Sequence, residues 1–469
     1  MRFPRLSLQV SDRKAILRLV DVSIVNGATL LALWLWTLRD PWRNFSREFV
    51  LSQAHWFIFL TALWVLLASV NDFYDLRVAS NPLASVLTLV KITLLMLWIY
   101  FLIYFLSAPR SLPRVVILFY GISSFALLGL WRLIYALLLS RPPFQRRAII
   151  VGAGRAGRTI VRAIRENVSQ DYQLVGYIDD DPAKQGQIIE GVPVIGTHHN
   201  LLNLVKDNGV SEVILAITRD MQGDTVQAIL KCREQGVNIV PMAVLYEQIT
   251  GRVPVEHIGD NWYDALPMAQ ASVISPYRFF KRLMDITFAV IGLVLTSPLF
   301  PLIFLAIFLE SPGPVLYEQQ RVGQGGRPFP IFKFRSMVIG AEEDGKARWA
   351  SRDDARITRV GRFLRRTHLD ELPQLVNVLK GEMSLVGPRP ERPEFVTELE
   401  KQIPFYGVRH AVRPGMAGWA LVKYGYGNST EDALVKLQYD LYYIKHQSLY
   451  LDLLIILKTI GHMLGFRGT

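Results

Sequence analysis

The chain has almost no cysteine and little charge for its length. Cys232 is the single cysteine among 469 residues, which excludes an intramolecular disulfide framework and a metal site built from cysteines. Charged residues make up only 20% of the chain and hydrophobic residues 51%, a balance that excludes a disordered protein. The sequence also contains no internal repeat and no low-complexity tract. We therefore expect a folded protein in a reducing compartment, with part of the chain in contact with a membrane.

Long apolar runs fill the first third of the chain. They cover residues 16–38, 56–70, 83–107 and 115–139. Three of them exceed the roughly 20 residues that a helix needs to cross a bilayer, and the second does so if it starts near Leu51. Helices buried in a soluble core would need polar faces, whereas these runs contain few charged residues beyond Asp21, Lys91 and Arg132. The runs predict four transmembrane helices.

Basic residues around these runs predict their orientation. The side that holds both ends of the four-helix region carries more Lys and Arg than the opposite side. Cytoplasmic loops carry such an excess. Both ends of the region, and the chain that follows it, are therefore expected in the cytoplasm.

A fifth apolar run, residues 283–309, is interrupted by Ser297-Pro298 and Pro301. Proline removes a backbone hydrogen bond and bends a helix. The interruption favours a broken helix that enters and leaves the membrane by the same face. A kinked fifth transmembrane helix is the alternative.

Between these apolar parts, residues 147–241 alternate short β-rich runs with helical stretches, which indicates βαβ units and a parallel sheet. The predicted strands are 148–151, 174–179, 213–217 and 237–241, and the predicted helices 157–166, 201–208 and 223–235. Gly152, Gly154 and Gly157 form a GxGxxG at the first strand-to-helix turn, and Asp179 ends the next strand. This pattern is typical of a site for a nucleotide phosphate and ribose. The same glycines equally serve close packing of a helix on a sheet, and both interpretations stay open.

The chemistry-bearing residues lie after Pro312. Residues 315–322 and 329–334 predict a hairpin around Gly323-Gln324-Gly325-Gly326, which leads to Lys333 and Arg335. Arginines then recur at every third position and predict a basic helix face for phosphates or anionic headgroups. They are Arg356, Arg359, Arg362 and Arg365, with Arg352 and Arg366 nearby.

An acidic pair, Asp370-Glu371, follows the arginines directly and precedes Pro373. Asp shortly before a first-turn proline is a common helix start, so an N-cap role is one interpretation of Asp370. The other is a carboxylate placed beside bound phosphate. Arg389, between two prolines, and Arg413, before Pro414-Gly415, are presented on fixed backbone that suits phosphate binding.

Four motifs in this order closely resemble the bacterial sugar transferase family, whose members are monotopic polyprenyl-phosphate phosphoglycosyl transferases. They are Lys333-Phe334-Arg335-Ser336-Met337, Leu369-Asp370-Glu371-Leu372-Pro373-Gln374, Gly387-Pro388-Arg389-Pro390 and Arg413-Pro414-Gly415. The resemblance covers nearly the whole chain. It implies transfer of a hexose 1-phosphate from a UDP-sugar to undecaprenyl phosphate, with release of UMP, as the first membrane step of exopolysaccharide, O-antigen or capsule synthesis.

The resemblance also implies a division of the chain. Residues 1–140 would form a four-helix transmembrane bundle and 141–245 a Rossmann-like nucleotide-binding-type domain. Residues 246–276 would be a linker or interaction element. The mainly helical catalytic domain would occupy 277–469, with the re-entrant helix at about 281–310, broken at Ser297 and Pro298. The chain would lie in the bacterial inner membrane with its catalytic domain on the cytoplasmic face.

Residue roles follow by resemblance. Asp370 resembles the nucleophile that forms a sugar-phosphoryl aspartate, and Glu371 its partner in deprotonating the lipid phosphate or organising Mg²⁺, with both carboxylates as metal ligands. Phosphate binding is implied for Lys333, Arg335, Arg365, Arg389 and Arg413. The implied partners are the UDP-sugar, polyprenyl phosphate and anionic lipids, a homodimer is one compatible oligomeric state, and nucleic acid is not expected.

Two other functions remain open at this point. A membrane-anchored nucleotide-sugar dehydratase or epimerase would need a Tyr/Lys pair inside the middle domain, whereas Tyr277 and Lys281 lie outside it and are expected to anchor the chain at the membrane interface. A nucleotide-sensing scaffold with an inactive C-terminal domain would not need the acidic pair.

Overall fold

The computed structural model describes residues 10–39, 44–106, 114–139, 145–218, 221, 223–257, 276–341, 354–425, 427 and 429–464. The chain forms two compact units, Met1–Thr250 and Gly251–Thr469, and each is described by itself. Arg352, the residues 258–275 of the expected linker and the first nine residues lie outside the described part.

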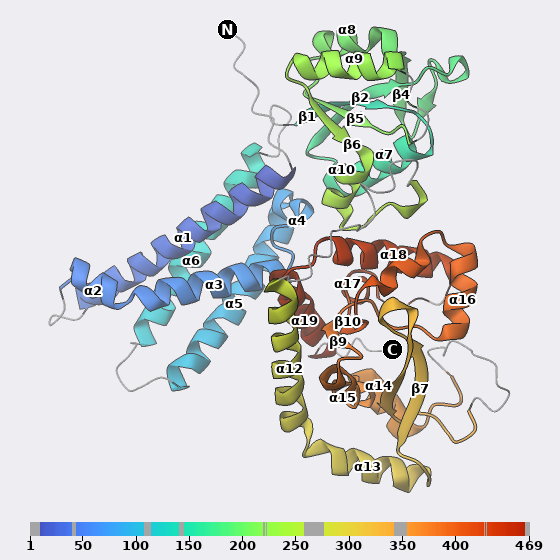
Figure 1. Cartoon of the computed structure of the whole chain (residues 1–469). Helices are drawn as coiled ribbons and strands as arrows, with labels where there is room; N and C mark the ends of the chain where they lie inside the picture. Colours follow the sequence, from blue (N-terminus) through green and yellow to red (C-terminus); the bar gives the residue numbers. More distant parts are fainter. Residues whose placement is uncertain are drawn as a thin grey trace. The chain divides into compact units, whose positions relative to one another are not determined.

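The first unit begins with apolar helices (Figure 1). They are α1 (Val10–Arg39), α3 (Ala54–Val70), α5 (Pro82–Leu106) and α6 (Arg114–Ile134), with the short α2 (Arg47–Ser52), α4 (Leu76–Ser80) and the π turn η1 (Tyr135–Leu139). Within the described residues, three helices are long and apolar enough to cross a membrane, in α1, α5 and α6. The condition under which the second run would reach bilayer length, a start near Leu51, is not met, because Gln53 ends α2 and leaves α3 only 17 residues long.

A buried ion pair joins α1 to α6. Arg132 Nη2 donates to Asp21 Oδ2 at 2.7 Å, and both side chains are fully buried. A charge among apolar helices is costly unless it is paired. Two of the three charged residues that interrupt these runs therefore tie α1 and α6 together.

The same unit ends in an α/β domain whose six-stranded sheet has the order β3-β4-β2-β1-β5-β6. The strands are β1 (Arg146–Val151), β2 (Tyr172–Ile178), β3 (Ile188–Ile189), β4 (Val192–Gly196), β5 (Glu212–Leu215) and β6 (Asn238–Pro241), and the helices α7 (Arg155–Val168), α8 (Leu201–Asp207), α9 (Gly223–Glu234) and α10 (Met242–Thr250). All neighbours are parallel except the short β3 on β4. The parallel sheet and the predicted helices are confirmed, and β3 and β4 were not predicted.

Alternation along β1 explains why helices cover both faces of this sheet. Ala148 and Ile150 belong to the apolar cluster that includes α7 and α10. Ile149 and Val151 belong to the cluster that includes α8, α9 and the buried Cys232. Successive strand residues point to opposite faces, so a continuous apolar strand is buried on both sides.

The second unit contains a helix pair bent by 62° at Ser297-Pro298, made of α12 (Pro276–Thr296) and α13 (Leu299–Glu310). The hairpin follows as predicted, with β7 (Leu316–Val322) antiparallel to β8 (Pro328–Phe334). The remaining described elements are the 3₁₀ turns η5 (Val255–His257) and η6 (Gln324–Gly326), α14 (Arg359–Thr367), the 3₁₀ turn η7 (Leu369–Glu371), α15 (Gln374–Lys380), β9 (Ser384–Val386), α16 (Pro393–Gln402), η8 (Tyr406–Ala411), β10 (Gly415–Ala417), α17 (Trp419–Lys423), α18 (Thr430–Lys445) and α19 (Leu449–Leu464).

Two parts of this unit fix α15 in place. Asn377, fully buried on α15, donates to Pro330 O at 2.7 Å and accepts from Phe332 N at 3.1 Å, which ties the helix to β8. Arg282 of α12 donates to the carbonyls of Val378 and Leu379 at 2.7 and 2.8 Å and so satisfies the C-terminal end of α15. The turn that precedes α15 is thereby held against β8.

Candidate active site

The acidic pair lies in a tight turn between two helices. α14 ends at Thr367, and its C-cap residue His368 adopts a left-handed conformation with φ 58°. η7 then carries Asp370 and Glu371 before α15 starts at Gln374. The turn brings both carboxylates inside, where Asp370 is 7% and Glu371 9% exposed. The N-cap interpretation of Asp370 is wrong, because the residue flanking α15 is Pro373 and no side chain caps that helix.

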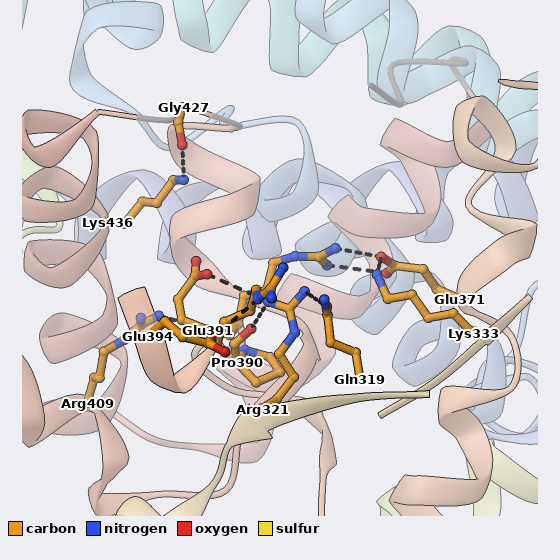
Figure 2. Close-up of polar contacts among 12 residues, drawn as sticks. Gln319, Arg321, Lys333, Glu371, Pro390, Glu391, Glu394, Arg409, Gly427 and Lys436 are labelled. Atoms are coloured by element: carbon orange, nitrogen blue, oxygen red, sulfur yellow. Dashed lines mark hydrogen bonds and ion pairs between the residues drawn. The ribbon is translucent and has the colours of Figure 1, made fainter. Parts of the chain in front are cut away.

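Glu371 is bound by two cations (Figure 2). Lys333 Nζ donates to Oε1 at 2.8 Å, and Arg389 donates through Nη2 to Oε1 at 2.5 Å and through Nη1 to Oε2 at 3.3 Å. Burial opposes the charge of this carboxylate, but Arg389 and Lys333 outweigh it and hold the pKa of Glu371 well below its usual range. Glu371 is therefore a carboxylate that stays ionised.

Asp370 is in a contrasting position one residue earlier. Among the described residues its carboxylate has no hydrogen bond or ion pair, although it is buried. Burial and the negative charge of Glu371 raise the pKa of Asp370 to about 6, against the charges of Lys333, Arg365 and Arg389. The result is a carboxylate that is mostly ionised at neutral pH and free to react.

The other basic residues predicted for the site divide into two groups. Arg365, on α14, lies close enough for its charge to act on Asp370. Arg335 lies just after β8 and donates to Ser311 O, beyond the end of α13. Arg413 makes no hydrogen bond or ion pair with the described residues, and its carbonyl oxygen lies against Gly387.

The predicted basic helix face is shorter than expected. α14 starts at Arg359, so Arg356 precedes it and is bound to Asp354 at 2.6 Å. Glu310 accepts from the backbone N–H groups of Arg359 and Val360 at 2.8 and 2.9 Å, which satisfies the start of α14. Arg362 and Arg366 remain exposed on the helix.

Two arginines bind backbone carbonyl groups of the loop that carries Arg389. Buried Arg409 donates through Nη2 to Arg389 O at 2.9 Å and is itself held by Asp440 at 2.8 Å. Arg321 donates to Pro390 O at 3.1 Å (Figure 2). Each contact fixes the backbone rather than the Arg389 side chain, which stays aimed at Glu371.

A buried network holds the start of the same loop. Lys281 Nζ and Tyr443 OH both donate to Val386 O at 3.1 Å. Asp452 is in turn bound by Lys281 at 3.1 Å, by Tyr443 at 2.7 Å and by Tyr277 at 2.8 Å. Tyr277 and Lys281, which the sequence predicted as an interfacial anchor, thus both bind a fully buried carboxylate.

Two glycines join the proline-flanked arginine motifs into one unit. β9 pairs in parallel with β10, and Gly387 N donates to Ala417 O while Gly415 N donates to Pro388 O, both at 2.9 Å. A Cβ on Gly387 would lie 2.4 Å from Arg413 O, and one on Gly415 would lie 2.1 Å from Gly387 N. Only glycine fits at either position, because the two backbones touch.

The fold requires glycine at two of the three positions of the middle-domain GxGxxG. Gly152 has φ +106°, and a Cβ on Gly157 would lie 2.1 Å from Gly152 O, so packing requires both. A Cβ on Gly154 would meet nothing within 4 Å. Asp179 accepts from Ala153 N at 2.8 Å and from Lys184 Nζ at 3.1 Å. Its carboxylate is therefore engaged within the loop, whereas the approach to Gly154 is open.

A magnesium ion fits the acidic pair only together with a substrate. Among the described residues, no group of three or more His, Cys, Asp or Glu side chains is arranged to hold a metal ion. Asp370 and Glu371 supply two carboxylates at most, and Glu371 is already bound to two cations. Mg²⁺ is commonly bound by one or two carboxylates with substrate phosphates and water. The donor set suits an ion that arrives with a diphosphate.

Two families match the chain. Residues 276–465 match the family described as bacterial sugar transferase, and this range contains the acidic pair and the cations around it. Residues 69–243 match the family described as CoA-binding domain.

Curated relatives cover overlapping parts of the chain. A UDP-N-acetylgalactosamine-undecaprenyl-phosphate N-acetylgalactosaminephosphotransferase of Aeromonas hydrophila is 46% identical over 53% of this chain and 57% of its own length. A UDP-glucose:undecaprenyl-phosphate glucose-1-phosphate transferase of Xanthomonas campestris pv. campestris is 36% identical over 68% of this chain and 67% of its own length. An enzyme of the same name from Escherichia coli (strain K12) is 32% identical over 67% of this chain and 67% of its own length. The chain thus matches between about half and two thirds of the length of these relatives.

Proposed function

Because the chain belongs to the bacterial sugar transferase family, we propose that it transfers a hexose 1-phosphate from a UDP-sugar to undecaprenyl phosphate and releases UMP. The observation that carries this proposal is the contrast within the acidic pair. Asp370 is buried and makes no hydrogen bond or ion pair with the described residues, while Glu371 is bound to Lys333 and Arg389. A reactive carboxylate beside fixed cations suits phosphoryl transfer.

The reaction takes two displacements. A carboxylate oxygen of Asp370 forms a bond to the β-phosphorus of the UDP-sugar as the bond to the bridging oxygen breaks, and UMP leaves with that oxygen. A phosphate oxygen of the lipid then forms a bond to the same phosphorus as the aspartyl oxygen leaves. Asp370 is restored as a carboxylate, and the product is a polyprenyl diphosphate sugar.

Lys333 and Arg389 neutralise the phosphate oxygens in both displacements. Glu371 is a positioning residue, since its two oxygens set the place of both cations. A carboxylate whose pKa lies well below its usual range takes up a proton poorly, so Glu371 is a weak general base. This assignment favours orientation over deprotonation of the lipid phosphate.

Mg²⁺ is part of the proposal as a cofactor that Asp370 and Glu371 would hold together with the substrate. When bound, it would neutralise charge on the diphosphate. Dependence of UMP release on added Mg²⁺, and its loss with excess EDTA, tests this part.

Membrane topology is also proposed. Four transmembrane helices and a re-entrant α12–α13 pair would place the second unit on the cytoplasmic face of the inner membrane, beside anionic headgroups. The 62° bend and the positive flanks of the helices support this arrangement. In a Cys232→Ser background, Arg278→Cys and Leu309→Cys should react with an impermeant reagent from the same side. Reaction from opposite sides would establish a kinked fifth transmembrane helix instead.

The dehydratase or epimerase alternative is not favoured. It needs a Tyr/Lys pair near the middle-domain glycines, but Tyr277 and Lys281 are bound to Asp452 in the other unit. The inactive scaffold is not favoured either, because the buried acidic pair and its cations are intact.

The experiment that tests the proposal is covalent labelling. Incubation with a UDP-sugar carrying ³²P in the β-phosphate should label the protein in the absence of lipid, and undecaprenyl phosphate should then remove the label. A panel of UDP-glucose, UDP-galactose and their N-acetylated relatives identifies the sugar through UMP release. Asp370→Asn should abolish labelling, and undiminished labelling of that variant would refute the assignment.

A further inference from the structure

A short segment of α12, residues 281–285, contacts both parts of the candidate active site. Helix α12 packs against α15, β9 and α19 in the second unit (Figure 1). α15 follows the turn that carries Asp370 and Glu371, and β9 ends just before the motif that carries Arg389. The distance between the acidic pair and Arg389 therefore depends on what holds α15 and β9 in place.

α12 holds α15 at both of its ends. At the C-terminal end, Arg282 donates through Nη1 to Val378 O at 2.7 Å and through Nη2 to Leu379 O at 2.8 Å. The two nitrogens of one planar guanidinium fix the direction of this contact as well as its length. At the N-terminal end, Leu375 packs in the same apolar cluster as the fully buried Ala289 of α12. The position of the turn that precedes α15 therefore follows the position of α12.

The same segment of α12 holds β9. Asp285, which is 1% exposed, accepts from Ser384 Oγ and from Leu385 N, both at 3.0 Å. Lys281 Nζ donates to Val386 O at 3.1 Å. Each of the three residues of β9 is thus bound by α12, and the proline-flanked arginine motif starts at the next residue.

These contacts place charged groups where burial is costly. Asp285 and Asp452 are 1% and 0% exposed, and the side chain of Lys281 is 15% exposed. Buried charges stabilise a fold no better than apolar side chains of similar volume. Hydrogen bonds in a protein interior do, however, specify one arrangement of the groups that they join. The polar contacts of α12 therefore indicate a need for fixed geometry.

We propose that Lys281, Arg282 and Asp285 are positioning residues that set the distance between the acidic pair and Arg389. The inference rests on the proposed function, since it concerns the alignment of the groups that carry out phosphoryl transfer. It adds a role for the bent helix pair, because α12 continues from this segment to the break at Ser297-Pro298. The helix that is proposed to enter the membrane is then also the helix that aligns the site.

Asp285→Asn gives the first test. The amide keeps the shape of the side chain, but it accepts only one of the two hydrogen bonds from β9 and turns an N–H group toward the other donor. In nanodiscs, the single-turnover rate of adduct formation should fall about tenfold or more, since small displacements of reacting groups slow catalysis strongly. An unchanged rate would overturn the proposal.

Glu398→Gln is the matched control for this substitution. It makes the same change from a carboxylate to an amide at an exposed pair with Lys401 on α16, and the rate should stay within about twofold. The stoichiometry of labelling reports the folded fraction of each variant, so rates are compared per active molecule.

A double-mutant cycle separates positioning from a general loss of stability. If Asp285 acts on the reaction through Arg389, replacing Asp285 has little effect once Arg389 is gone. In an Arg389→Ala background, Asp285→Asn should therefore lower the rate of adduct formation by less than about twofold, whereas independent effects would multiply. An equal fold-loss in both backgrounds would make Asp285 a residue of the fold alone and would contradict the proposal.

Arg282→Lys tests the other end of the arrangement and applies even if Asp285→Asn does not fold. A single ammonium group cannot reproduce the two bonds to α15, and adduct formation should slow by about fivefold or more. Arg278→Lys, the same change at an exposed position in the first turn of α12, should leave the rate within about twofold. Equal rates for the two variants would refute the role of Arg282.

The two proposals fail in different ways. If no UDP-sugar forms the covalent adduct on the unsubstituted protein, the proposed function fails. If the adduct forms, but its rate does not respond to Asp285→Asn and Arg282→Lys, only the positioning role of α12 fails.

Discussion

Arg389 binds Glu371 through two hydrogen bonds, from Nη2 to Oε1 at 2.5 Å and from Nη1 to Oε2 at 3.3 Å. Such paired bonds fix the plane of the guanidinium as well as its distance. The carbonyl of the same Arg389 is bound by Arg409. Both ends of Arg389 are therefore fixed before any substrate arrives, which lowers the reorganisation needed during phosphoryl transfer.

The rate of adduct formation should depend on the ionisation of Asp370. Burial and the charge of Glu371 raise its pKa to about 6, and only the carboxylate attacks phosphorus. The single-turnover rate should therefore be constant above about pH 7 and fall tenfold per pH unit well below pH 6. Quenched-flow labelling with the UDP-sugar alone measures this single-turnover rate at each pH. A rate that starts to fall only near pH 3.9, about the ordinary pKa of aspartate, would contradict the assignment.

Glu371→Gln should separate the positioning role from the reactive one. The amide cannot neutralise Lys333 and Arg389, so both cations lose their fixed places, and kcat should fall about 100-fold. Removal of the negative charge also lowers the pKa of Asp370, so the acid limb should move to lower pH. Glu394→Gln, at an exposed pair with Arg392, is the control. A normal kcat for Glu371→Gln would exclude the positioning role.

Gly415→Ala should destabilise the second unit. Its Cβ would lie 2.1 Å from Gly387 N, so the β9–β10 ladder must move apart at a cost of about 3 kcal/mol. Gly461→Ala makes the same change in α19 where nothing lies within 4 Å, and it should be neutral or stabilise by up to about 1 kcal/mol. Thermal unfolding in nanodiscs compares the two. Equal melting temperatures would mean that the backbones do not touch.

Arg409→Lys should weaken the loop although it keeps the charge. Arg409 donates to Asp440 through Nε and Nη2, to Tyr406 through Nη1 and to Arg389 O through Nη2, and a single ammonium group cannot reproduce this spread of donors. We expect a loss of about 2 kcal/mol in the free energy of unfolding, together with a lower kcat. Arg162→Lys, at an exposed pair with Glu190, should change neither. Full activity of Arg409→Lys would show that the carbonyl contact is dispensable.

Local patterns in the sequence predicted several elements well. The hairpin, the parallel strands and the break at Ser297-Pro298 were all visible, because glycine, proline and β-branched residues act within a few positions of themselves. The start of α3 was missed because Gln53 carries no strong breaker signal. The short β3 and β4 were missed because two and five residues give little periodicity.

The site depends on contacts that no local pattern reveals. Arg409 and Asp440 are 31 residues apart, and Lys281 and Asp452 are 171 apart. Neither pair stands out in the sequence, although each holds the loop of Arg389. The N-cap interpretation of Asp370 failed because a left-handed His368 redirects the chain just before it, and helix propensities do not predict such a turn.

The contact between Gly387 and Gly415 has a consequence for the interpretation of related gene sequences. The two glycines belong to motifs that look independent in the sequence, yet neither backbone can hold its position if the other residue gains a side chain. The motifs must therefore persist or decay together during evolution. A paralogue that has lost one of these glycines, even with its acidic pair intact, can be recognised from its gene as a candidate pseudoenzyme.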